Sequence, residues 1–331
     1  PKLAHLDLSD NCLHNTDRRT VIFRALAECT SLTHLNLAAN GKVGVMEEFS
    51  AAVANVVIKL KNLKHLDLSR NSIGFLGTAL LAPVLQCCTA LQQLDYKQNN
   101  VRDRREHLGS MVAHSKSLTH LDLSSDVLAP SFFRLVSVSK SLKTLILRRQ
   151  TMNLSGVEGW AANLLDCVSL VHLDLTSAGL STKGAEQLAA ALGNCKASLH
   201  LLDLSENRIH DKGVQAISAV LAQGQCRCLT DLNLSYNDIS MDEETAASVG
   251  LGVSKCTTLL RLNLVGNRFE GHEPASMKLL ARGLGASGIS LLELGGTFFT
   301  AEGVKHLAEA LPGCRKLVKL DLFGSLQTVG G

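Results

Sequence analysis

One pattern of hydrophobic and polar positions recurs twelve times along the 331-residue chain. Residues 199–209 show it most clearly, with apolar residues at the first, fourth, sixth and eleventh positions and asparagine at the ninth, the frame LxxLxLxxNxI. Alternation over Leu202, Asp203 and Leu204 predicts a short strand whose leucines point inward. The Asn207 amide can then satisfy backbone groups of adjacent turns. One such turn buries too little to fold alone, so the pattern predicts a stacked solenoid.

The residues between the predicted strands have the periodicity of helices. Residues 181–192 open with the capping residue Ser181 and repeat Ala185, Leu188 and Leu192 on one face. Segments 212–221 and 302–311 follow the same plan, each with a glycine that lets the helix start pack close to its neighbour. We therefore expect an α/β solenoid of about twelve repeats, a single array over residues 1–331. Its first positions are Leu3, Leu32, Leu63, Leu91, Leu118, Leu142, Leu170, Leu199, Leu229, Leu259, Ile289 and Leu317.

The repeats over residues 91–180 depart from the frame. Asp126, Gln150 and Ala178 replace the asparagine, and Tyr96 stands where a leucine is expected. The shortest repeat, from Leu118 to Leu142, leaves room only for an abbreviated helix over residues 130–138. We expect the curvature or twist of the array to change in this block. Both ends lack the polar caps with which solenoids usually close, so the chain is expected to be part of a longer protein.

Composition narrows the class of protein. A net charge of +3 does not by itself favour nucleic acid or an anionic membrane, and no apolar run is long enough to span a membrane. No secretory signal opens the chain. Seven of the ten cysteines lie three or four residues before a first position, which indicates packing at a corner rather than disulfides or zinc. Ten free thiols favour a reducing, intracellular (cytoplasmic) location.

The strand frame, the glycine-led helix and the Cys-x-x-Leu corner together resemble the ribonuclease-inhibitor-like subfamily of leucine-rich repeats. The resemblance covers residues 3 to about 326. It implies a right-handed horseshoe, with a parallel sheet on the concave face and helices on the convex side. Similar arrays occur in ribonuclease inhibitor, in Ran GTPase-activating proteins and in nucleotide-binding immune receptors. The GxxxxGK[ST] motif of those receptors does not occur in this chain.

The resemblance favours a non-enzymatic scaffold that binds another protein on its concave face, without a cofactor or a metal. One alternative is a GTPase-activating protein resembling the Ran regulator. Another is a structural component of a ciliary, cytoskeletal or organellar assembly. No local motif beyond the repeat supports carrying a catalytic residue over from the first alternative.

The outward positions of the predicted strands carry more acid than base. Over the third, fifth, seventh and eighth positions we count eleven acids and six bases, an acidic face that favours a basic protein partner and disfavours nucleic acid. Histidines occupy five of the third positions, four of them as His-x-Asp. A metal or general-base site is one interpretation. The favoured one is a stock form of the repeat that makes a stripe and not a pocket.

Two parts of this face are candidate binding sites. An acidic strip spans the seventh to ninth repeats, and the sixth repeat breaks the pattern because Ile146 replaces the outward acid and two arginines follow it. An exposed aliphatic residue ringed by arginine is typical of an interface hot spot. We expect Arg148→Ala or Ile146→Asp to weaken binding more than Asp203→Ala. The strip consists of Asp174, Asp203, Glu206 and Asp231, and the cluster of Ile146, Arg148, Arg149 and Lys97, with Arg102, Arg104 and Arg105 nearby.

Overall fold

A computed structural model describes residues 2–41, 46–103, 106–128, 130–150, 159–269, 273–297 and 299–325. The chain divides into two compact units. The first contains residues 1–152 with 166–170, and the second contains residues 153–165 with 171–331. The boundary falls within the block of irregular repeats. Each unit is described by itself below.

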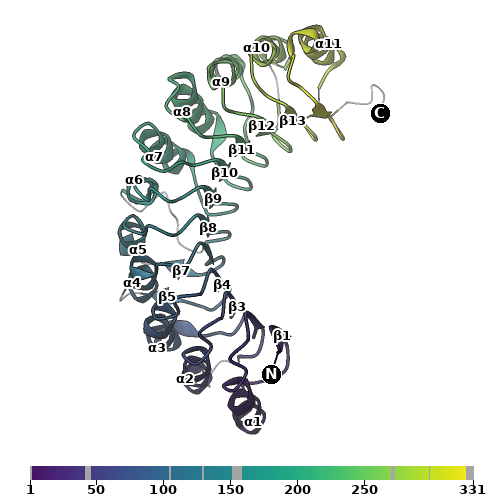
Figure 1. Cartoon of the computed structure of the whole chain (residues 1–331). Helices are drawn as coiled ribbons and strands as arrows, with labels where there is room; N and C mark the ends of the chain where they lie inside the picture. Colours follow the sequence, from purple (N-terminus) through teal and green to yellow (C-terminus); the bar gives the residue numbers. More distant parts are fainter. Residues whose placement is uncertain are drawn as a thin grey trace. The chain divides into compact units, whose positions relative to one another are not determined.

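Among its described residues, each unit contains six three-residue strands in the predicted frame, and neighbouring strands within a unit pair in parallel (Figure 1). The first unit holds β1 (His5–Asp7), β2 (His34–Asn36), β3 (His65–Asp67), β4 (Gln93–Asp95), β6 (His120–Asp122) and β8 (Thr144–Ile146). The second holds β9 (His172–Asp174), β10 (Leu201–Asp203), β11 (Asp231–Asn233), β12 (Arg261–Asn263), β13 (Leu291–Glu293) and β14 (Lys319–Asp321).

A helix follows each strand but the last, as the periodicity predicts, and in each unit the helices lie on one side of the strands (Figure 1). We call the opposite sheet face the open face; it is the face predicted to be concave. Helix α5 has only seven residues, which confirms the predicted short helix. In the first unit the helices are α1 (Thr16–Leu26), α2 (Met46–Val57), α3 (Gly74–Gln86), α4 (His107–His114) and α5 (Pro130–Val136). In the second they are α6 (Trp160–Leu165), α7 (Thr182–Leu192), α8 (His210–Ala222), α9 (Glu243–Lys255), α10 (Glu273–Gly285) and α11 (Ala301–Ala310), followed by the short 3-10 helix η2 (Leu311–Gly313).

The fourth-position leucines stack in register within each unit, which confirms the predicted inward row. All of them are buried except Leu6 and Leu320, which lie on end strands and are half-buried. The first row is Leu6, Leu35, Leu66, Leu94, Leu121 and Leu145. The second is Leu173, Leu202, Leu232, Leu262, Leu292 and Leu320.

The ninth-position asparagines form a buried ladder that joins one turn to the next. The Asn71 carboxamide oxygen accepts the backbone N–H groups of Asn40 and Gly41, both at 2.6 Å. Its Nδ2 donates to the carbonyl oxygens of Leu37 and Leu68, both at 2.9 Å. Because the Asn71 side chain is fully buried, water cannot take its place as the hydrogen-bond partner of these backbone groups.

The irregular block alters this ladder at Asp126. Its carboxylate accepts the N–H of Val101 at 2.8 Å and that of Asn99 at 3.3 Å, as an asparagine oxygen would. Burial, opposed by these hydrogen bonds and assisted by the charge of Asp122, raises its pKa to about 7. An aspartate has no side-chain N–H group to donate to a carbonyl. The next repeat supplies such a donor, because Nε2 of Gln150 donates to the Leu123 carbonyl at 3.0 Å.

The same block contains a small second sheet that the frame does not predict. Strand β5 (Arg102–Asp103) pairs in parallel with β7 (Val127–Leu128). Arg102 therefore lies in a strand and not at a helix start as expected. Arg104 and Arg105 lie outside the described residues.

A left-handed residue precedes the ninth position in all twelve repeats, each with φ between 50° and 68°. Nine of them are not glycine, so the turn imposes this conformation on ordinary side chains at some cost. The residues are Asp10, Ala39, Arg70, Gln98, Ser125, Arg149, Ser177, Glu206, Tyr236, Gly266, Gly296 and Gly324.

Glycines bring neighbouring helices of the second unit close together. A Cβ added at Gly213 would lie 2.9 Å from the Ala185 side chain, which confirms the predicted close approach of that helix start. The tightest approach joins α9 to α10, where a Cβ at Gly283 would overlap the backbone of Gly250. This contact explains two glycines in the middle of helices that would otherwise favour alanine.

Gly283→Ala is therefore expected to lower the free energy of unfolding by about 2 kcal/mol, since the new methyl group forces α9 and α10 apart. Urea unfolding followed by circular dichroism measures the effect. Gly285→Ala on the same helix is the matched control, because the nearest atom to its Cβ is the Ala310 carbonyl oxygen at 3.7 Å. Equal midpoints for the two variants would contradict the proposed close packing.

The cysteines lie at the corners, but their burial is less uniform than predicted. Cys167, Cys226 and Cys256 are buried, and all ten thiols are free. Cys29 and Cys88 are only half-buried, because each thiol turns back to a carbonyl four residues earlier, that of Ala25 at 3.4 Å or Val84 at 3.2 Å. Burial raises the pKa of Cys226 to about 12, so its thiol stays protonated and packs as an apolar group.

Candidate functional site

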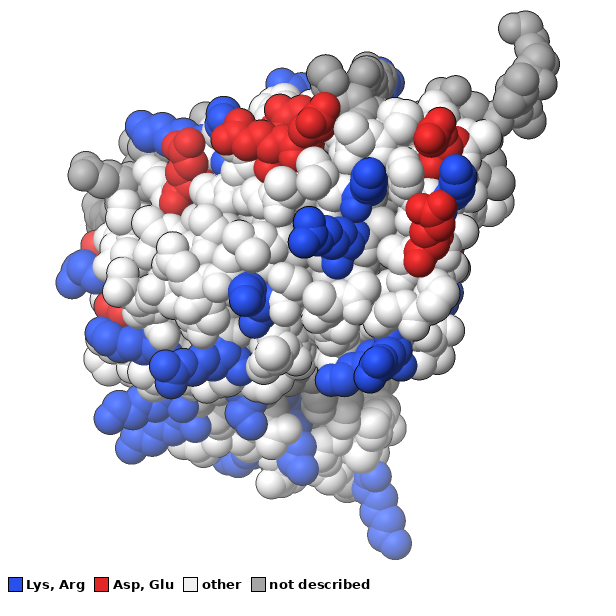
Figure 2. Space-filling view, turned by 90° about the horizontal axis from the view of Figure 1, so that it is seen from above, with Lys and Arg blue, Asp and Glu red and all other residues white. Residues whose placement is uncertain are grey.

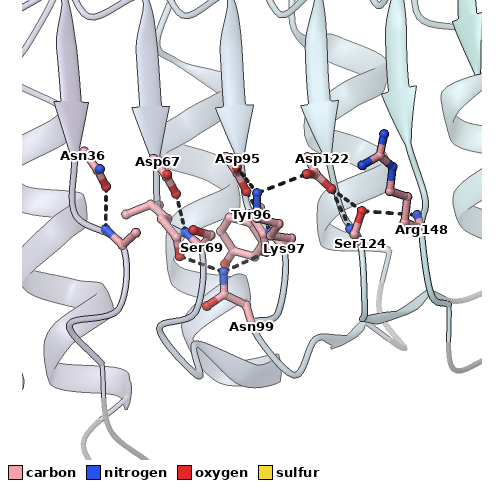
Figure 3. Close-up of polar contacts among 12 residues, drawn as sticks. Asn36, Asp67, Ser69, Asp95, Tyr96, Lys97, Asn99, Asp122, Ser124 and Arg148 are labelled. Atoms are coloured by element: carbon pink, nitrogen blue, oxygen red, sulfur yellow. Dashed lines mark hydrogen bonds and ion pairs between the residues drawn. The ribbon is translucent and has the colours of Figure 1, made fainter. Parts of the chain in front are cut away.

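The fifth-position acids of the open face have a structural task that the frame alone does not reveal. Asp67 accepts the N–H of Ser69 at 2.8 Å, and Asp122 accepts that of Ser124 at 2.9 Å (Figure 3). Asp203 does the same for Ser205 at 2.9 Å. Each carboxylate thereby caps the turn that ends its own strand. These acids, whose charge was predicted to attract a partner, therefore already accept hydrogen bonds within their own repeats.

The acidic strip predicted in the second unit is not an open acidic surface. Asp174 is only 8% exposed, because its carboxylate is tucked against Thr176, whose N–H and hydroxyl donate at 3.0 and 2.7 Å. The prediction that Asp174 is exposed is therefore wrong. Asp203 accepts further hydrogen bonds from the Ser205 hydroxyl at 2.6 Å and from Asn233 at 3.0 Å.

The other two members of that strip lie in different rows. Asp231 is in the third-position row, where the Arg261 guanidinium neutralises it at 2.6 Å. Glu206 is exposed and lies in the left-handed row. The four residues therefore share neither one row nor one level of exposure.

Lys97 was predicted to join the basic cluster of the sixth repeat, but it lies between two carboxylates. Its ammonium group is 2.7 Å from Asp95 and 3.5 Å from Asp122 (Figure 3). Burial alone would lower the pKa of Lys97, yet the hydrogen bond to Asp95 and the charges of Asp95, Asp122 and Asp67 raise it above its ordinary value. Burial raises the pKa of Asp95, assisted by Asp67 and Asp122 and opposed by Lys97. Lys97 therefore neutralises its own strand and is not an open cation.

Ile146, Arg148 and Arg149 occupy the positions predicted for them. Ile146 lies in register with Asp122 on the open face and is half-buried, while both arginines are exposed. Arg149 adopts the left-handed conformation with φ 50°. Because isoleucine cannot cap its turn, the Arg148 N–H donates to the Ser124 hydroxyl of the neighbouring strand at 3.2 Å (Figure 3).

The histidines of the first three repeats form a hollow, contrary to the prediction of a stripe without a pocket. The rings of His5, His34 and His65 stack with centroids 3.9 and 4.0 Å apart. Together with Asp7, Asn36, Asp67, Gln93 and Asp95 they line a space of about 500 Å³. The in-register strands of three repeats that all carry histidine align the rings, whereas His120 and His172 do not line this hollow.

The pKa of the central imidazole of this stack, that of His34, lies below its ordinary value. Burial, with help from the neighbouring charges of His65, His5 and Lys64, lowers the pKa of His34. His65 hydrogen-bonds to the Gln93 side chain. Across the described ranges, no three His, Cys, Asp or Glu residues are arranged to hold a metal ion. The hollow is therefore a recess for contact and offers no metal centre among these residues.

Tyr236 is an exposed aromatic residue of the second unit that sequence reasoning did not select. It is 56% exposed, in the left-handed row, and its ring covers the place where a Cβ of Gly266 would lie. Tyrosine is common in interface hot spots. The signal that could have identified it is the glycine at the same position of the next repeat.

Comparison with known families supports the repeat assignment. The model described as "Leucine Rich repeat" matches residues 59–77, 166–189, 196–218 and 225–241. "NACHT, LRR and PYD domains-containing protein 12" of Mus musculus is 31% identical over 195 residues, which are 56% of this chain and 18% of that protein. Protein 9 of the same series from Bos taurus is 25% identical over 291 residues, 80% of this chain and 27% of that protein. The chain thus spans only about a quarter or less of these relatives.

Among solved structures, a leucine-rich-repeat protein of Leptospira interrogans superposes with a TM-score of 0.53 at 18% identity. The match covers 97% of this chain and 84% of that one, and it shows a shared fold. Within the described ranges, none of the helices is both long enough and apolar enough to cross a membrane.

Proposed function

This chain is a leucine-rich repeat protein, and from that premise we propose that it binds another protein through the open face of its first unit. The proposed contact centre is the sixth-repeat cluster, which we define as Ile146, Arg148 and Arg149. The proposed activity is non-enzymatic and uses no cofactor. The ten free thiols support an intracellular location.

The observation that carries this proposal is how the sixth repeat compensates for Ile146. The repeat lacks the acid that caps its turn, and the Ser124 hydroxyl bonds the Arg148 N–H in its place. The same hydroxyl donates to Asp122 at 2.5 Å, so the turn is satisfied without help from position 146. Ile146 therefore adds no polar contact to its own turn, and its partly exposed aliphatic side chain is available to a partner.

The neighbouring surface suggests the chemistry of that partner. Arginine can pair with a carboxylate through two parallel hydrogen bonds, and Ile146 offers an apolar contact at the same point. Next to them, Asp95, Asp122 and Lys97 form an acidic group with a net charge of −1. A partner with an apolar side chain, a carboxylate for Arg148 and a basic group for these acids would fit this face.

We expect Arg148→Ala and Ile146→Asp each to weaken binding of the partner at least about tenfold, because truncating an interface anchor costs about 2 kcal/mol or more. Folding should be retained, since an aspartate at position 146 can cap its turn as in the other repeats. The partner is isolated by pull-down from the source cell, purified and titrated by calorimetry.

The matched control for these variants is Asp203→Asn. It removes a charge from the open face of the second unit but keeps an acceptor for the Ser205 N–H. This change is preferable to alanine, because loss of the carboxylate oxygen would disturb the turn. Small, equal effects of all three variants would exclude the sixth-repeat cluster as the contact centre.

A further inference from the structure

A second charged surface lies on the edge of the first unit where its strands begin. Four corner segments there, residues 57–64, 86–93, 113–120 and 137–144, each lead from a helix into the next strand. Together they contain six lysines and no aspartate or glutamate. All six are exposed. We call this surface the lysine edge, and its members are Lys59, Lys61, Lys64, Lys116, Lys140 and Lys143.

These lysines are not engaged in the ion pairs found elsewhere in the chain. Among the residues that the structure describes, no carboxylate lies within 4.0 Å of any of the six ammonium groups. Lys97 and Lys212, in contrast, each contact a carboxylate at 2.7 and 3.2 Å. The lysine edge therefore keeps its charge available to an external anion.

The helix dipoles explain only part of this charge. All helices of the unit end at this edge, where cations are favoured, but the effect fades within the last turn. Neither α2 nor α3 has a basic residue in its last turn. Lys64 and Lys143 lie still further on, at the second position of the strand frame. More positive charge is present than capping the helix ends requires.

Basic and acidic residues lie at opposite edges of the unit, so their charges largely cancel in the net charge of the chain. The opposite edge, where the helices begin, has acids such as Asp17, Glu47 and Glu48 in the first turns. On the face that Figure 2 presents, most acidic side chains lie toward the upper border, and basic ones lie among them, across the middle and along the lower border. A net charge of +3 is thus compatible with a strongly basic edge.

We propose that the lysine edge binds an acidic segment of a partner protein, a run of aspartate and glutamate interspersed with apolar residues. The six cations come from three of the four consecutive corner segments, with none in residues 86–93, and a row of this length suits an extended chain. Exposed Ile58 and Val138 lie among them and can contact apolar side chains. This surface is separate from the open face, so the proposal does not depend on the sixth-repeat cluster.

Residue types on the edge favour a protein over other polyanions. Its four segments contain no arginine, which binds phosphate through a planar fork, and no phenylalanine, tyrosine or tryptophan on which a nucleic-acid base could stack. Two separated aliphatic side chains are also a small apolar area for insertion into a membrane. Flexible lysines with interspersed aliphatic residues match carboxylates with interspersed apolar side chains.

The test measures fluorescence anisotropy of a labelled peptide of alternating glutamate and leucine on the full chain. The triple variant Lys116→Glu, Lys140→Glu, Lys143→Glu is expected to bind it at least about tenfold more weakly, and raising the salt from about 0.05 to about 0.3 M should weaken binding to the unmodified chain. The control, Lys183→Glu, Lys278→Glu, Lys305→Glu, makes the same change in net charge at exposed lysines of the second unit. Circular dichroism verifies that both variants are folded.

Equal loss of binding in both variants would show an effect of net charge and overturn the proposal, as would no loss in either. Duplex DNA and vesicles containing phosphatidylserine are measured at the same salt concentration. Tighter binding of either one than of the peptide would overturn the choice of an acidic protein segment. Weaker binding of both, together with loss of peptide binding only in the edge variant, supports it.

Discussion

Asn71→Ala is expected to lower the free energy of unfolding by about 4 kcal/mol, the largest effect that the structure predicts for a single side chain. The change leaves the N–H groups of Asn40 and Gly41 without their partner. It also removes one of the two side-chain hydrogen bonds to each of the buried carbonyls of Leu37 and Leu68, which keep those from Asn40 and Asn99. Each unsatisfied buried group costs about 1–3 kcal/mol, and partial hydration of the loosened turn offsets some of this cost. Urea unfolding followed by circular dichroism measures the loss.

Asn11→Ala is the matched control for this variant. Asn11 holds the same frame position in the first repeat, but it is exposed and its Nδ2 donates only to the Ser9 carbonyl, at 3.0 Å. Its loss should change stability by less than about 1 kcal/mol. A similar change in both variants would mean that the amide ladder does not join neighbouring turns as the structure indicates.

Asp126→Asn is expected to stabilise the chain above pH 7 and to have little effect near pH 4. The carboxyl has an ordinary pKa of 3.8 and a folded-state pKa of about 7 because it is buried. Between these values the folded state holds a proton that the unfolded state has released, so stability falls as pH rises from about 4 to about 7. Above pH 7 the buried charge costs up to about 4 kcal/mol, and asparagine avoids this cost.

The measurement is the difference in unfolding free energy between Asp126→Asn and the unmodified chain at pH values from 4 to 8. The difference should increase with pH and level off above about 7. Asp10→Asn, at an exposed carboxylate of the first repeat, controls for the change in net charge. A difference that does not vary with pH would show that Asp126 is ionised in the folded state throughout this range.

The two proposed binding surfaces differ in what makes them available. At the first surface, Ile146 is available because a neighbouring hydroxyl meets the requirement of its turn. The lysine edge is available because the corner segments around Lys116 and Lys140 contain no acid. Binding at the first should depend on individual side chains, and binding at the second on summed charge and on salt.

The sequence by itself determined the strands, their register and the buried ladder. Leu202 and Asn207 have these roles because a period of two sets which side chains point inward, and each repeat needs the same residues at the same places. Helix α8 could be predicted for the same reason, since Val214, Ile217 and Leu221 form one buried face. The frame also selected Ile146 and Arg148, because a departure from a strict repeat is visible without coordinates.

Tertiary structure decided which outward residues are open to a partner. Asp174 and Glu206 are both acids on predicted outward positions, yet one is buried against Thr176 and the other is exposed. Lys97 was grouped with the arginines by position, but two carboxylates hold it, one of them from the neighbouring strand. Some of these contacts lie within one turn and others, such as that of Lys97 with Asp122, join adjacent repeats. All of them depend on side-chain rotamers and local burial, which the frame does not specify. The frame therefore fixes the direction of a side chain, whereas its neighbours in its own turn and in adjacent repeats determine whether it is available for binding.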